Sequence, residues 1–224
     1  MSKVIALVHT TPLAMGPANA ACHEIYPEAQ IKNIVDDSLL ADLQDNDGMI
    51  NQDLRERLEI LVKYGESAGA DAILLTCSSY SPCAQDFHRK VTVPFFRADD
   101  ALLAEAVDNG PRIGLIATVP SAIETATQGL KTIARNQGKE ITIASSLCKE
   151  AFDALGRGDN DGHDSALIAK ILELTPEADV IVLAQYSMAR VMSALPDDVP
   201  VRVLSSPHLG IAHLKQILTA IPTS

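Results

Sequence analysis

The chain has 224 residues, which is enough for one large or two small domains with a substantial buried core. It carries 18 basic and 29 acidic residues, a net charge of −11, and no basic tract, which argues against a surface for nucleic acid or anionic membrane. With 47% hydrophobic residues it is not a disordered chain. An acidic ligand would therefore have to be held by local groups rather than by the overall charge.

The N-terminus and the cysteines indicate the compartment. The apolar run 4–8 is too short for a membrane span, and no signal-peptide cleavage pattern follows it. The four cysteines, at positions 22, 77, 83 and 148, form no CxxC pair. We therefore expect a cytoplasmic protein whose thiols are reduced.

Strands and helices alternate along the first half of the chain, which is typical of a parallel α/β sheet. Apolar residues recur at the spacing of one helix face between positions 50 and 68. The acidic segment 36–47 is expected to be a long loop that either covers a binding site or only connects two elements. The expected strands are 3–9, 31–35, 72–75 and 93–97, and helices are expected after Pro12, at 50–68 and after Pro82.

The segment DAILLTCSSYSP, residues 71–82, holds the strongest candidate for chemistry. Its apolar run 72–75, closed by Thr76, has the unbroken character of a buried parallel strand, and Cys77 follows directly. Three serines, Ser78, Ser79 and Ser81, can then cap the next helix. A thiol beside a helix N-terminus is easily ionised and easily met by an anionic ligand. The alternative is that Cys77 is only a small core residue.

The second half of the chain repeats the first. The strand beginning at Lys3 resembles the one at Arg112, and the run after Asp71 resembles the run after Asp179, at offsets of 109 and 108 (112 − 3 and 179 − 71). A Val-Pro pair at 93 recurs at 199, at an offset of 106 (199 − 93). Three matches in one order predict two similar α/β lobes. We expect an N-terminal lobe at 1–97, a C-terminal lobe at 98–206, and a C-terminal helix at 207–224 that packs back on the N-terminal lobe.

Hydroxyl-bearing residues gather at the expected strand ends, where parallel α/β lobes bind their ligands. With helix-start N–H groups they can hold a carboxylate without much positive charge. Each one alone is equally well explained as a helix cap. Together they favour a small anionic ligand in a cleft between the lobes. The expected binding residues are Thr10, Thr11, Ser78, Ser79, Thr118, Ser121, Ser187 and His208, with Tyr186, for which a packing role is an equal alternative.

Four short motifs support a family resemblance. They are Thr76–Ser81, Ile116–Thr118 with Ser121, the strand 180–184 with its following loop, and Ser205–Pro207. Together they resemble the aspartate/glutamate/hydantoin racemase superfamily, which also includes maleate isomerase and arylmalonate decarboxylase, over nearly the whole chain. The resemblance implies two pseudo-symmetric α/β lobes with the active site in the cleft between them. It also implies cofactor-independent proton chemistry next to a carboxylate, and frequent dimerisation.

Inversion at a carbon beside a carboxylate takes a thiolate on one face and a thiol on the other. Lobe symmetry would supply both, but the offset of 108 aligns Cys77 with Gln185 (77 + 108). A glutamine amide can hold a substrate oxygen, although it does not exchange a proton near neutral pH. We assign Cys77 and Gln185 as the catalytic positions, and this departure from two cysteines puts racemisation by a symmetric pair in doubt.

Three explanations of the missing second thiol stay open. Cys77 alone could act in a one-base isomerisation, decarboxylation or other lyase reaction. Cys148 or His208 could supply the second proton, whereas Cys83 is less attractive because it falls inside the next helix. The third explanation is a cleft that binds without catalysis.

Other motifs are absent. The six histidines show no HExxH and no metal-ligand spacing, and no dinucleotide, P-loop or GxSxG motif occurs. The glycine-rich stretch 156–162 follows no strand and is interpreted as a flexible turn. We therefore expect neither a metal nor a cofactor.

The sequence thus predicts a cofactor-independent racemase or isomerase that uses Cys77 for proton chemistry next to the carboxylate of a small acid. The alternatives are a one-base decarboxylase or lyase of the same superfamily and a non-catalytic protein that binds small carboxylates. We expect a homodimer or higher homo-oligomer, with no nucleic-acid or membrane partner.

Overall fold

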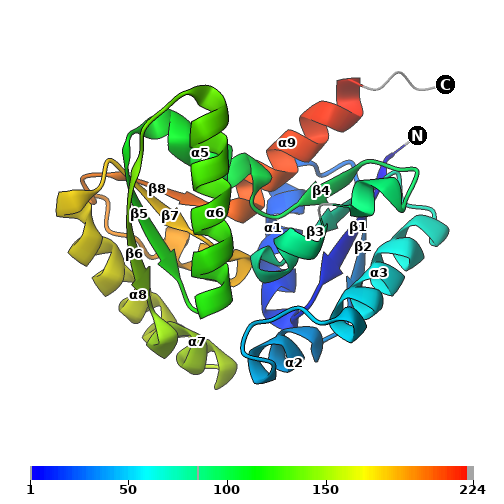
Figure 1. Cartoon of the computed structure of the whole chain (residues 1–224), viewed down its shortest axis with the longest axis horizontal. Helices are drawn as coiled ribbons and strands as arrows, with labels where there is room; N and C mark the ends of the chain where they lie inside the picture. Colours follow the sequence, from blue (N-terminus) through cyan, green and yellow to red (C-terminus); the bar gives the residue numbers. More distant parts are fainter. Residues whose placement is uncertain (1, 85, 221–224) are drawn as a thin grey trace. The chain divides into compact units, whose positions relative to one another are not determined.

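The computed structural model describes residues 2–84 and 86–220 and divides into two compact units. Unit 1 comprises the residues up to Ala98 together with the C-terminal segment from Pro207, and unit 2 comprises Asp99–Ser206. In Figure 1 the colours of unit 1 run from blue to green-cyan, with its C-terminal helix in red, and those of unit 2 run from green to orange.

Unit 1 is built on a four-stranded parallel sheet in the order β2-β1-β3-β4. Its strands are β1 (Val4–His9), β2 (Gln30–Val35), β3 (Ala72–Leu75) and β4 (Phe95–Arg97). Its helices are α1 (Met15–Ile25), α2 (Leu39–Asp45), α3 (Gln52–Ser67), α4 (Ser81–Ala84) and α9 (Ser206–Ala220), with 3-10 turns η1 (Pro12–Ala14), η2 (Ser78–Tyr80) and η3 (Phe87–Arg89). All four residues of β3 are buried, because this strand has a neighbour on each side and helices over the sheet.

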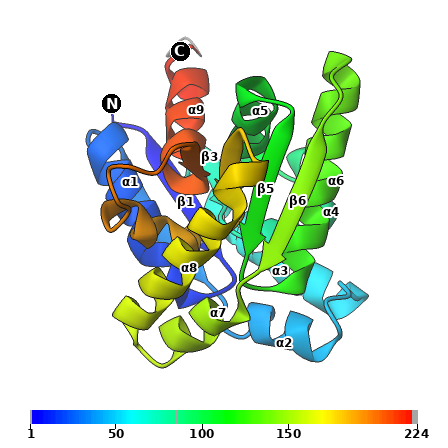
Figure 2. The ribbon, with the colours of Figure 1, turned by 90° about the vertical axis from the view of Figure 1, so that its left-hand side faces the viewer.

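Unit 2 repeats this plan with a parallel sheet in the order β6-β5-β7-β8. Its strands are β5 (Arg112–Ala117), β6 (Thr142–Leu147), β7 (Val180–Leu183) and β8 (Arg202–Ser205). Its helices are α5 (Asp100–Asn109), α6 (Pro120–Gln137), α7 (Lys149–Gly156) and α8 (Asn160–Leu174), with 3-10 turns η4 (Thr175–Glu177) and η5 (Tyr186–Ser193). Figure 2 shows α6 on one side of β5 and β6 and α8 on the other, so helices cover both faces of this sheet.

Three strands of each sheet are related by a shift of 108 positions along the sequence, whereas β2 and β6 are related by a shift of 112 (142 − 30). Ile5 pairs with Ala72 in unit 1, and Ile113 pairs with Val180 in unit 2. Each residue of the second pair lies 108 positions after its counterpart (113 − 5 and 180 − 72). The predicted fold class, two similar lobes that each contain a parallel sheet flanked by helices, is confirmed.

A repeated aspartate fixes the start of the central strands in both units. Asp71 accepts a hydrogen bond of 2.7 Å from the N–H of Val4 and pairs with Lys3. Asp179 accepts one of 2.9 Å from the N–H of Arg112, whose guanidinium also pairs with it. The aspartate that precedes each apolar run therefore has a structural role in pairing the two central strands.

The segment 36–47, which was expected to be a loop, contains helix α2. Leu39, Leu40 and Leu43 are buried on one side of this helix. Their i, i+1, i+4 spacing places them on one helical face, and the burial of three leucines outweighs the weak helix propensity of the surrounding aspartates. The prediction of a long loop is wrong for this reason.

The match between the two Val-Pro pairs is also wrong. β4 pairs Phe95 with Ile73, and β8 pairs Val203 with Ile181, so Phe95 corresponds to Val203, again 108 positions on (203 − 95). Pro200 precedes β8 rather than lying within it. Because a proline has no N–H to give to a sheet, its position in the sequence is a poor guide to strand register.

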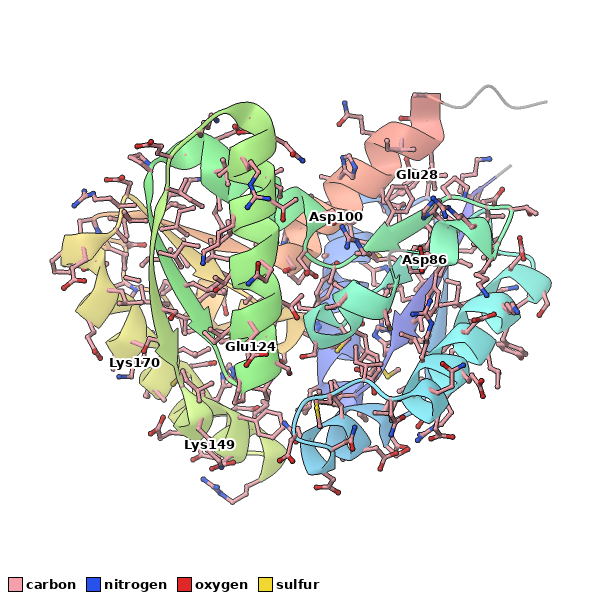
Figure 3. The ribbon with its side chains drawn as sticks, in the orientation of Figure 1. Glu28, Asp86, Asp100, Glu124, Lys149 and Lys170 are labelled. Carbon is pink, nitrogen blue, oxygen red and sulfur yellow. The ribbon has the colours of Figure 1, made fainter. Side chains whose placement is uncertain are left out.

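Charged side chains lie along the outward faces of the unit 2 helices (Figure 3). Glu124 and Lys149 are exposed, and Lys149 forms an ion pair with Asp153 one helical turn away. The opposite faces bury apolar residues such as Leu130 and Leu167. The helices are therefore amphipathic and pack their apolar side on the sheet.

Candidate functional site

In unit 1, Thr10 and Cys77 leave the sheet side by side at its carboxyl edge. Val8 of β1 pairs with Leu75 of β3, and each of the two residues follows its strand partner by two positions. The N–H of Thr76 donates to the carbonyl of Val8 at 3.0 Å and carries the strand pairing one step further. Neighbouring parallel strands thus bring a hydroxyl and a thiol from distant parts of the sequence to one edge.

Cys77 occupies the cap position of η2 in an extended conformation, with 9% of its surface exposed. Ser78 and Ser79, which were expected to cap a helix here, instead form η2 itself and are buried. The helix predicted after Pro82 begins one residue before it, at Ser81. The cysteine, rather than a serine, therefore lies where the strand turns into helical backbone.

Burial disfavours the thiolate form of the other three cysteines. No disulfide joins any of the four cysteines, which all lie in the described part of the chain. Burial raises the pKa of Cys22 to about 12 and that of Cys83 to about 11, and it also raises the pKa of Cys148. Cys148 packs in the apolar core of unit 2, among residues such as Ile116, which does not favour it as a second proton donor.

A buried histidine lies beneath the edge that carries Thr10 and Cys77. His9 is completely buried, with Nδ1 2.8 Å from Thr76 Oγ1 and Nε2 2.9 Å from Asn33 Oδ1. Burial lowers the pKa of His9, and the hydrogen bond to Asn33 opposes this effect. His9 is therefore held neutral and links the ends of three adjacent strands, β2, β1 and β3, directly below the site.

The two threonines after β1 have different surroundings. Thr10 is completely buried, and within the described residues its Oγ1 has no hydrogen-bond partner. Thr11 caps η1 by accepting a hydrogen bond of 3.4 Å from the N–H of Leu13. A buried hydroxyl without a partner costs free energy, which makes Thr10 the better candidate for binding a ligand oxygen.

In unit 2 the equivalent positions are Thr118 and Gln185. Ile116 pairs with Leu183, and each candidate again follows its strand partner by two positions. Gln185 Oε1 accepts a hydrogen bond of 2.6 Å from the N–H of Thr118 and one of 3.0 Å from its hydroxyl. A backbone N–H can only donate, so this contact fixes which end of the amide is the oxygen. The amide NH₂ is therefore the end of Gln185 that remains to bind another acceptor.

The remaining candidates of unit 2 lie near this edge. Ser121 is in the first turn of α6, which follows β5, and Tyr186 and Ser187 open η5 directly after Gln185. Tyr186 is 1% exposed and Ser187 is 9% exposed. The strand ends thus bring together five of the predicted residues, Thr118, Ser121, Gln185, Tyr186 and Ser187.

His208 has a different setting from the other candidates. It lies on α9, half of its side chain is exposed, and its Nε2 is 2.8 Å from Glu24 Oε2 of α1. Its imidazole is therefore engaged by a carboxylate in unit 1.

The sequence match defines the family. The model of the Asp/Glu/Hydantoin racemase family matches residues 17–214, which is most of the chain. The protein belongs to this family. Membership of this family supports an isomerase of the racemase type. No curated protein sequence gives a significant match to the chain.

Solved racemase structures share the fold of this family member at low sequence identity. A glutamate racemase from Bacillus anthracis is 16% identical, with a TM-score of 0.76 over 97% of this chain and 82% of that chain. An aspartate racemase homologue from Pyrococcus horikoshii OT3 is 19% identical, with a TM-score of 0.70 over 98% of this chain and 100% of that chain. An allantoin racemase from Klebsiella pneumoniae is 14% identical, with a TM-score of 0.72 over 100% and 91%. These similarities extend over at least 97% of this chain and establish the two-lobed α/β fold.

Two further observations concern metals and membranes. Among residues 2–84 and 86–220, no group of three or more His, Cys, Asp or Glu side chains is arranged to hold a metal ion. Within the same ranges, none of the helices is both long and apolar enough to cross a bilayer. Metal and cofactor independence stay predictions, as do the compartment and the oligomeric state.

Sequence reasoning missed His9 and Asn33, which support the site from below. The one available signal was a polar residue at the end of an otherwise apolar strand, in the run VIALVH. That pattern does not say which neighbouring strand its side chain meets, because the strand order is a property of the fold.

Proposed function

We propose that this member of the racemase family catalyses cofactor-independent proton exchange at the carbon next to the carboxylate of a small acid, with Cys77 as the reacting group. Cys77 takes the proton from carbon as a thiolate, or returns one as a thiol. The observation that carries the proposal is the pair of equivalent strand ends, Thr10 with Cys77 and Thr118 with Gln185.

Gln185 is proposed to donate a hydrogen bond to a substrate oxygen. Its amide oxygen is occupied by Thr118, so its NH₂ group is held in one orientation. A fixed donor stabilises the negative charge that develops on a carboxylate oxygen as the neighbouring carbon loses its proton. Thr10, with its buried hydroxyl, is proposed to bind a carboxylate oxygen as well. Thr11, Ser78, Ser79, Ser121, Tyr186, Ser187 and His208 remain proposed substrate contacts.

A one-base decarboxylation is the second candidate, and the glutamine at the position equivalent to Cys77 favours it. In that reaction the C–C bond to a second carboxylate breaks, CO₂ leaves, and the electron pair stays on the enediolate carbon. The thiol of Cys77 then gives its proton to this carbon, and the thiolate is reprotonated from water. No second acid is needed, which accords with an amide at position 185.

Proton NMR in D₂O tests the proposal with a panel of small amino, hydroxy and dicarboxylic acids. We expect the wild-type protein to remove one substrate C–H signal and Cys77→Ala to leave it intact. Cys83→Ala is the matched control, because Cys83 lies six residues away, is similarly buried and has a raised pKa. Chiral analysis of the same sample separates inversion from exchange on one face, and released CO₂ identifies decarboxylation.

Differential alkylation provides a readout that needs no substrate. We expect iodoacetamide to modify Cys77 faster than the three thiols whose pKa is raised by burial, and small carboxylates to protect it. If Cys77→Ala turns over a reactive compound as fast as wild type, the assignment of Cys77 is wrong. Carboxylate protection without turnover of any compound would instead indicate a binding protein.

A further inference from the structure

The first turn of α2 joins the two strand-end segments of unit 1. The N–H of Leu40 donates to the carbonyl of Thr10 at 3.1 Å, and the hydroxyl of Tyr80 donates to the carbonyl of Leu39 at 2.8 Å. Tyr80 is completely buried and lies three residues after Cys77. Helix α2 is thus attached both to the residue that follows β1 and to the turn that follows Cys77.

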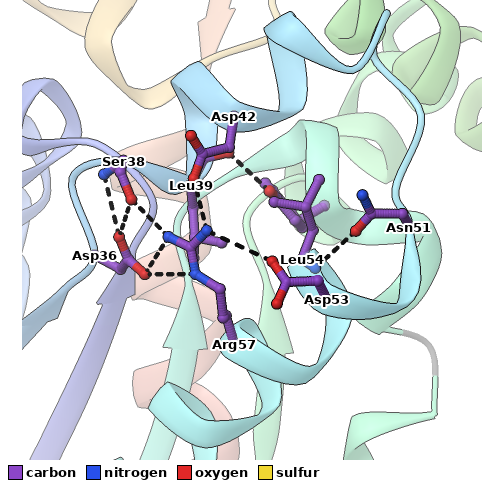
Figure 4. Close-up of polar contacts among 9 residues, drawn as sticks. Asp36, Ser38, Leu39, Asp42, Asn51, Asp53, Leu54 and Arg57 are labelled. Carbon is purple, nitrogen blue, oxygen red and sulfur yellow. Dashed lines mark hydrogen bonds and ion pairs between the residues drawn. The ribbon is translucent and has the colours of Figure 1, made fainter.

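Arg57 of α3 contacts polar side chains of the same turn (Figure 4). Its guanidinium binds Asp36 through Nε at 3.2 Å and Nη2 at 2.7 Å, and Asp42 through Nη1 at 2.6 Å. It also binds the hydroxyl of Ser38, and Asp53 lies 3.9 Å away. The bonded groups come from both sides of the start of α2, so one side chain fixes the two ends of its first turn.

The contacts of Arg57 with Asp36, Ser38 and Asp42, here called the clamp, require an arginine because of the charges involved. Burial acts to raise the pKa of Asp36, but hydrogen bonds from Arg57 and Ser38 bring it below its ordinary value. Asp42 and Asp36 together raise the pKa of the Arg57 guanidinium above its ordinary value. Without Arg57, the two carboxylates on the α2 segment would repel each other with no cation between them. A lysine would keep the charge, but a single ammonium does not reproduce the separate contacts of a planar fork.

We propose that α2 forms a wall of the Cys77 site and that Arg57 is a positioning residue that holds this wall in place. The clamp keeps Leu39 and Leu40 where Tyr80 and Thr10 bind them, and so keeps the turn that follows the thiol in one arrangement. The catalytic consequence rests on the proposed role of Cys77, whereas the structural consequence does not.

The structural test compares Arg57→Ala with Lys63→Ala in the full-length protein. Lys63 is on the same helix and pairs with Glu59 one turn away, so its loss removes a cation and an ion pair without touching α2. We expect Arg57→Ala to speed hydrogen exchange of the peptide covering 38–48 at least tenfold and alkylation of Cys77 by iodoacetamide about fivefold. Cys22 and Cys148 should keep their wild-type alkylation rates. Lys63→Ala should change neither the hydrogen exchange of the peptide 38–48 nor the alkylation of Cys77.

The catalytic test uses whichever acid the NMR panel identifies as substrate. We expect Arg57→Ala to raise KM about tenfold and to change kcat less than twofold, because substrate binding must then order the wall. Arg57→Lys should recover only part of this loss. Tyr80→Phe should show a similar KM effect, and the double variant should be less than additive, since both side chains act on α2.

The outcomes separate this inference from the function it builds on. Unchanged hydrogen exchange of the peptide 38–48 in Arg57→Ala would show that Arg57 does not hold α2. Faster exchange of this peptide with an unchanged rate of Cys77 alkylation would show that α2 is not a wall of the Cys77 site. If all four thiols react faster, Arg57→Ala has lost its fold. Asp42→Asn, which weakens one contact of the clamp, then replaces it, and we expect smaller increases in peptide exchange and in Cys77 alkylation. A Cys77→Ala protein with full activity would end the proposed function but leave the exchange and alkylation results standing.

Discussion

The carboxyl edges of the two sheets have the same backbone plan but carry different side chains, a thiol in unit 1 and an amide in unit 2. Thr10 and Thr118 each follow the first central strand by the same step, and Cys77 and Gln185 follow the second. In unit 2 the glutamine occupies its threonine with two hydrogen bonds. In unit 1 a thiol takes that place, and the buried threonine hydroxyl finds no partner in the described residues.

This difference shows how equivalent positions in the two halves of a duplicated fold can take different roles. In unit 2 the amide oxygen of Gln185 satisfies the N–H and the hydroxyl of Thr118 and leaves one oriented donor, the amide NH₂ group. Unit 1 keeps a polar group unsatisfied beside an ionisable thiol, an arrangement that costs stability and is typical of sites that bind ligands. We propose that unit 1 carries the reacting group and that unit 2 binds a substrate oxygen.

Making the unit 1 edge resemble that of unit 2 should have the largest effect. Cys77→Gln replaces the thiol by an amide that can accept from Thr10, and we expect kcat/KM to fall by about a thousandfold, within the range of a lost general base. Cys77→Ser, closer in size, should lose activity to a similar degree because a hydroxyl is a much weaker base. Steady-state kinetics together with thermal melting separate this loss from unfolding. Activity retained in either variant would contradict the claim that the thiol of Cys77 is the reacting group.

Reversing the exposed end of Gln185 should have the next largest effect. Gln185→Glu keeps an oxygen to accept both hydrogen bonds from Thr118 but replaces the NH₂ donor by a second oxygen. We expect kcat/KM to fall about 30- to 100-fold, since an oriented donor is worth about 2–3 kcal/mol at a developing oxyanion. Double-mutant kinetics with Cys77→Ser then report whether both residues act on one substrate. Wild-type rates in Gln185→Glu would exclude the amide as a donor.

The two threonines should respond oppositely to the same substitution. Thr118→Val removes a hydroxyl that donates to Gln185, and we expect the free energy of unfolding to fall by about 1 kcal/mol. Thr10→Val removes a buried hydroxyl that lacks a partner, so the free energy of unfolding should stay unchanged or rise by about 1 kcal/mol. Thr10→Val should nevertheless raise KM if that hydroxyl binds substrate. Denaturant titration measures both stabilities, and equal losses would contradict the contrast.

Both units should also share a dependence of stability on pH. Burial lowers the pKa of His9 in unit 1 and of His163 in unit 2. The unfolded chain therefore binds protons near pH 6.5 that the folded chain does not. Stability should be fully present above this pH and fall as the pH is lowered from there toward the folded pKa, by at most about 1.4 kcal/mol per pH unit for each histidine.

Replacing one of these histidines checks the assignment. His9→Gln should reduce the slope of unfolding free energy against pH between pH 7 and 5, measured by denaturant titration at several pH values. Most carboxylates are ionised in both states over this range, so the slope reports chiefly on histidine. A slope identical to that of wild type would show that His9 does not titrate differently in the two states.

The sequence by itself determined the fold class and identified Cys77 as the candidate thiol. Unbroken apolar runs such as AILL, repeated in both halves, are typical of a strand buried on both faces, and the aspartate before each run makes the same backbone contact in both halves. The apolar run is a local signal, because it is encoded within a few residues, whereas the contact that each aspartate makes joins residues 67 positions apart. The candidate Cys77 followed from its position directly after such a strand.

Tertiary structure decided the details that depend on distant contacts. The shift of 108 shared by three strand pairs, the hydrogen bonds between Thr118 and Gln185, and the contacts of His9 all depend on residues far apart in sequence. Helix α2 was hidden because its aspartates weaken the helical signal, while the burial of its leucines and the clamp of Arg57 exist only in the folded chain. Packing and charge pairing across such distances favour one arrangement among many that the local pattern allows, and this is why the sequence alone did not reveal them.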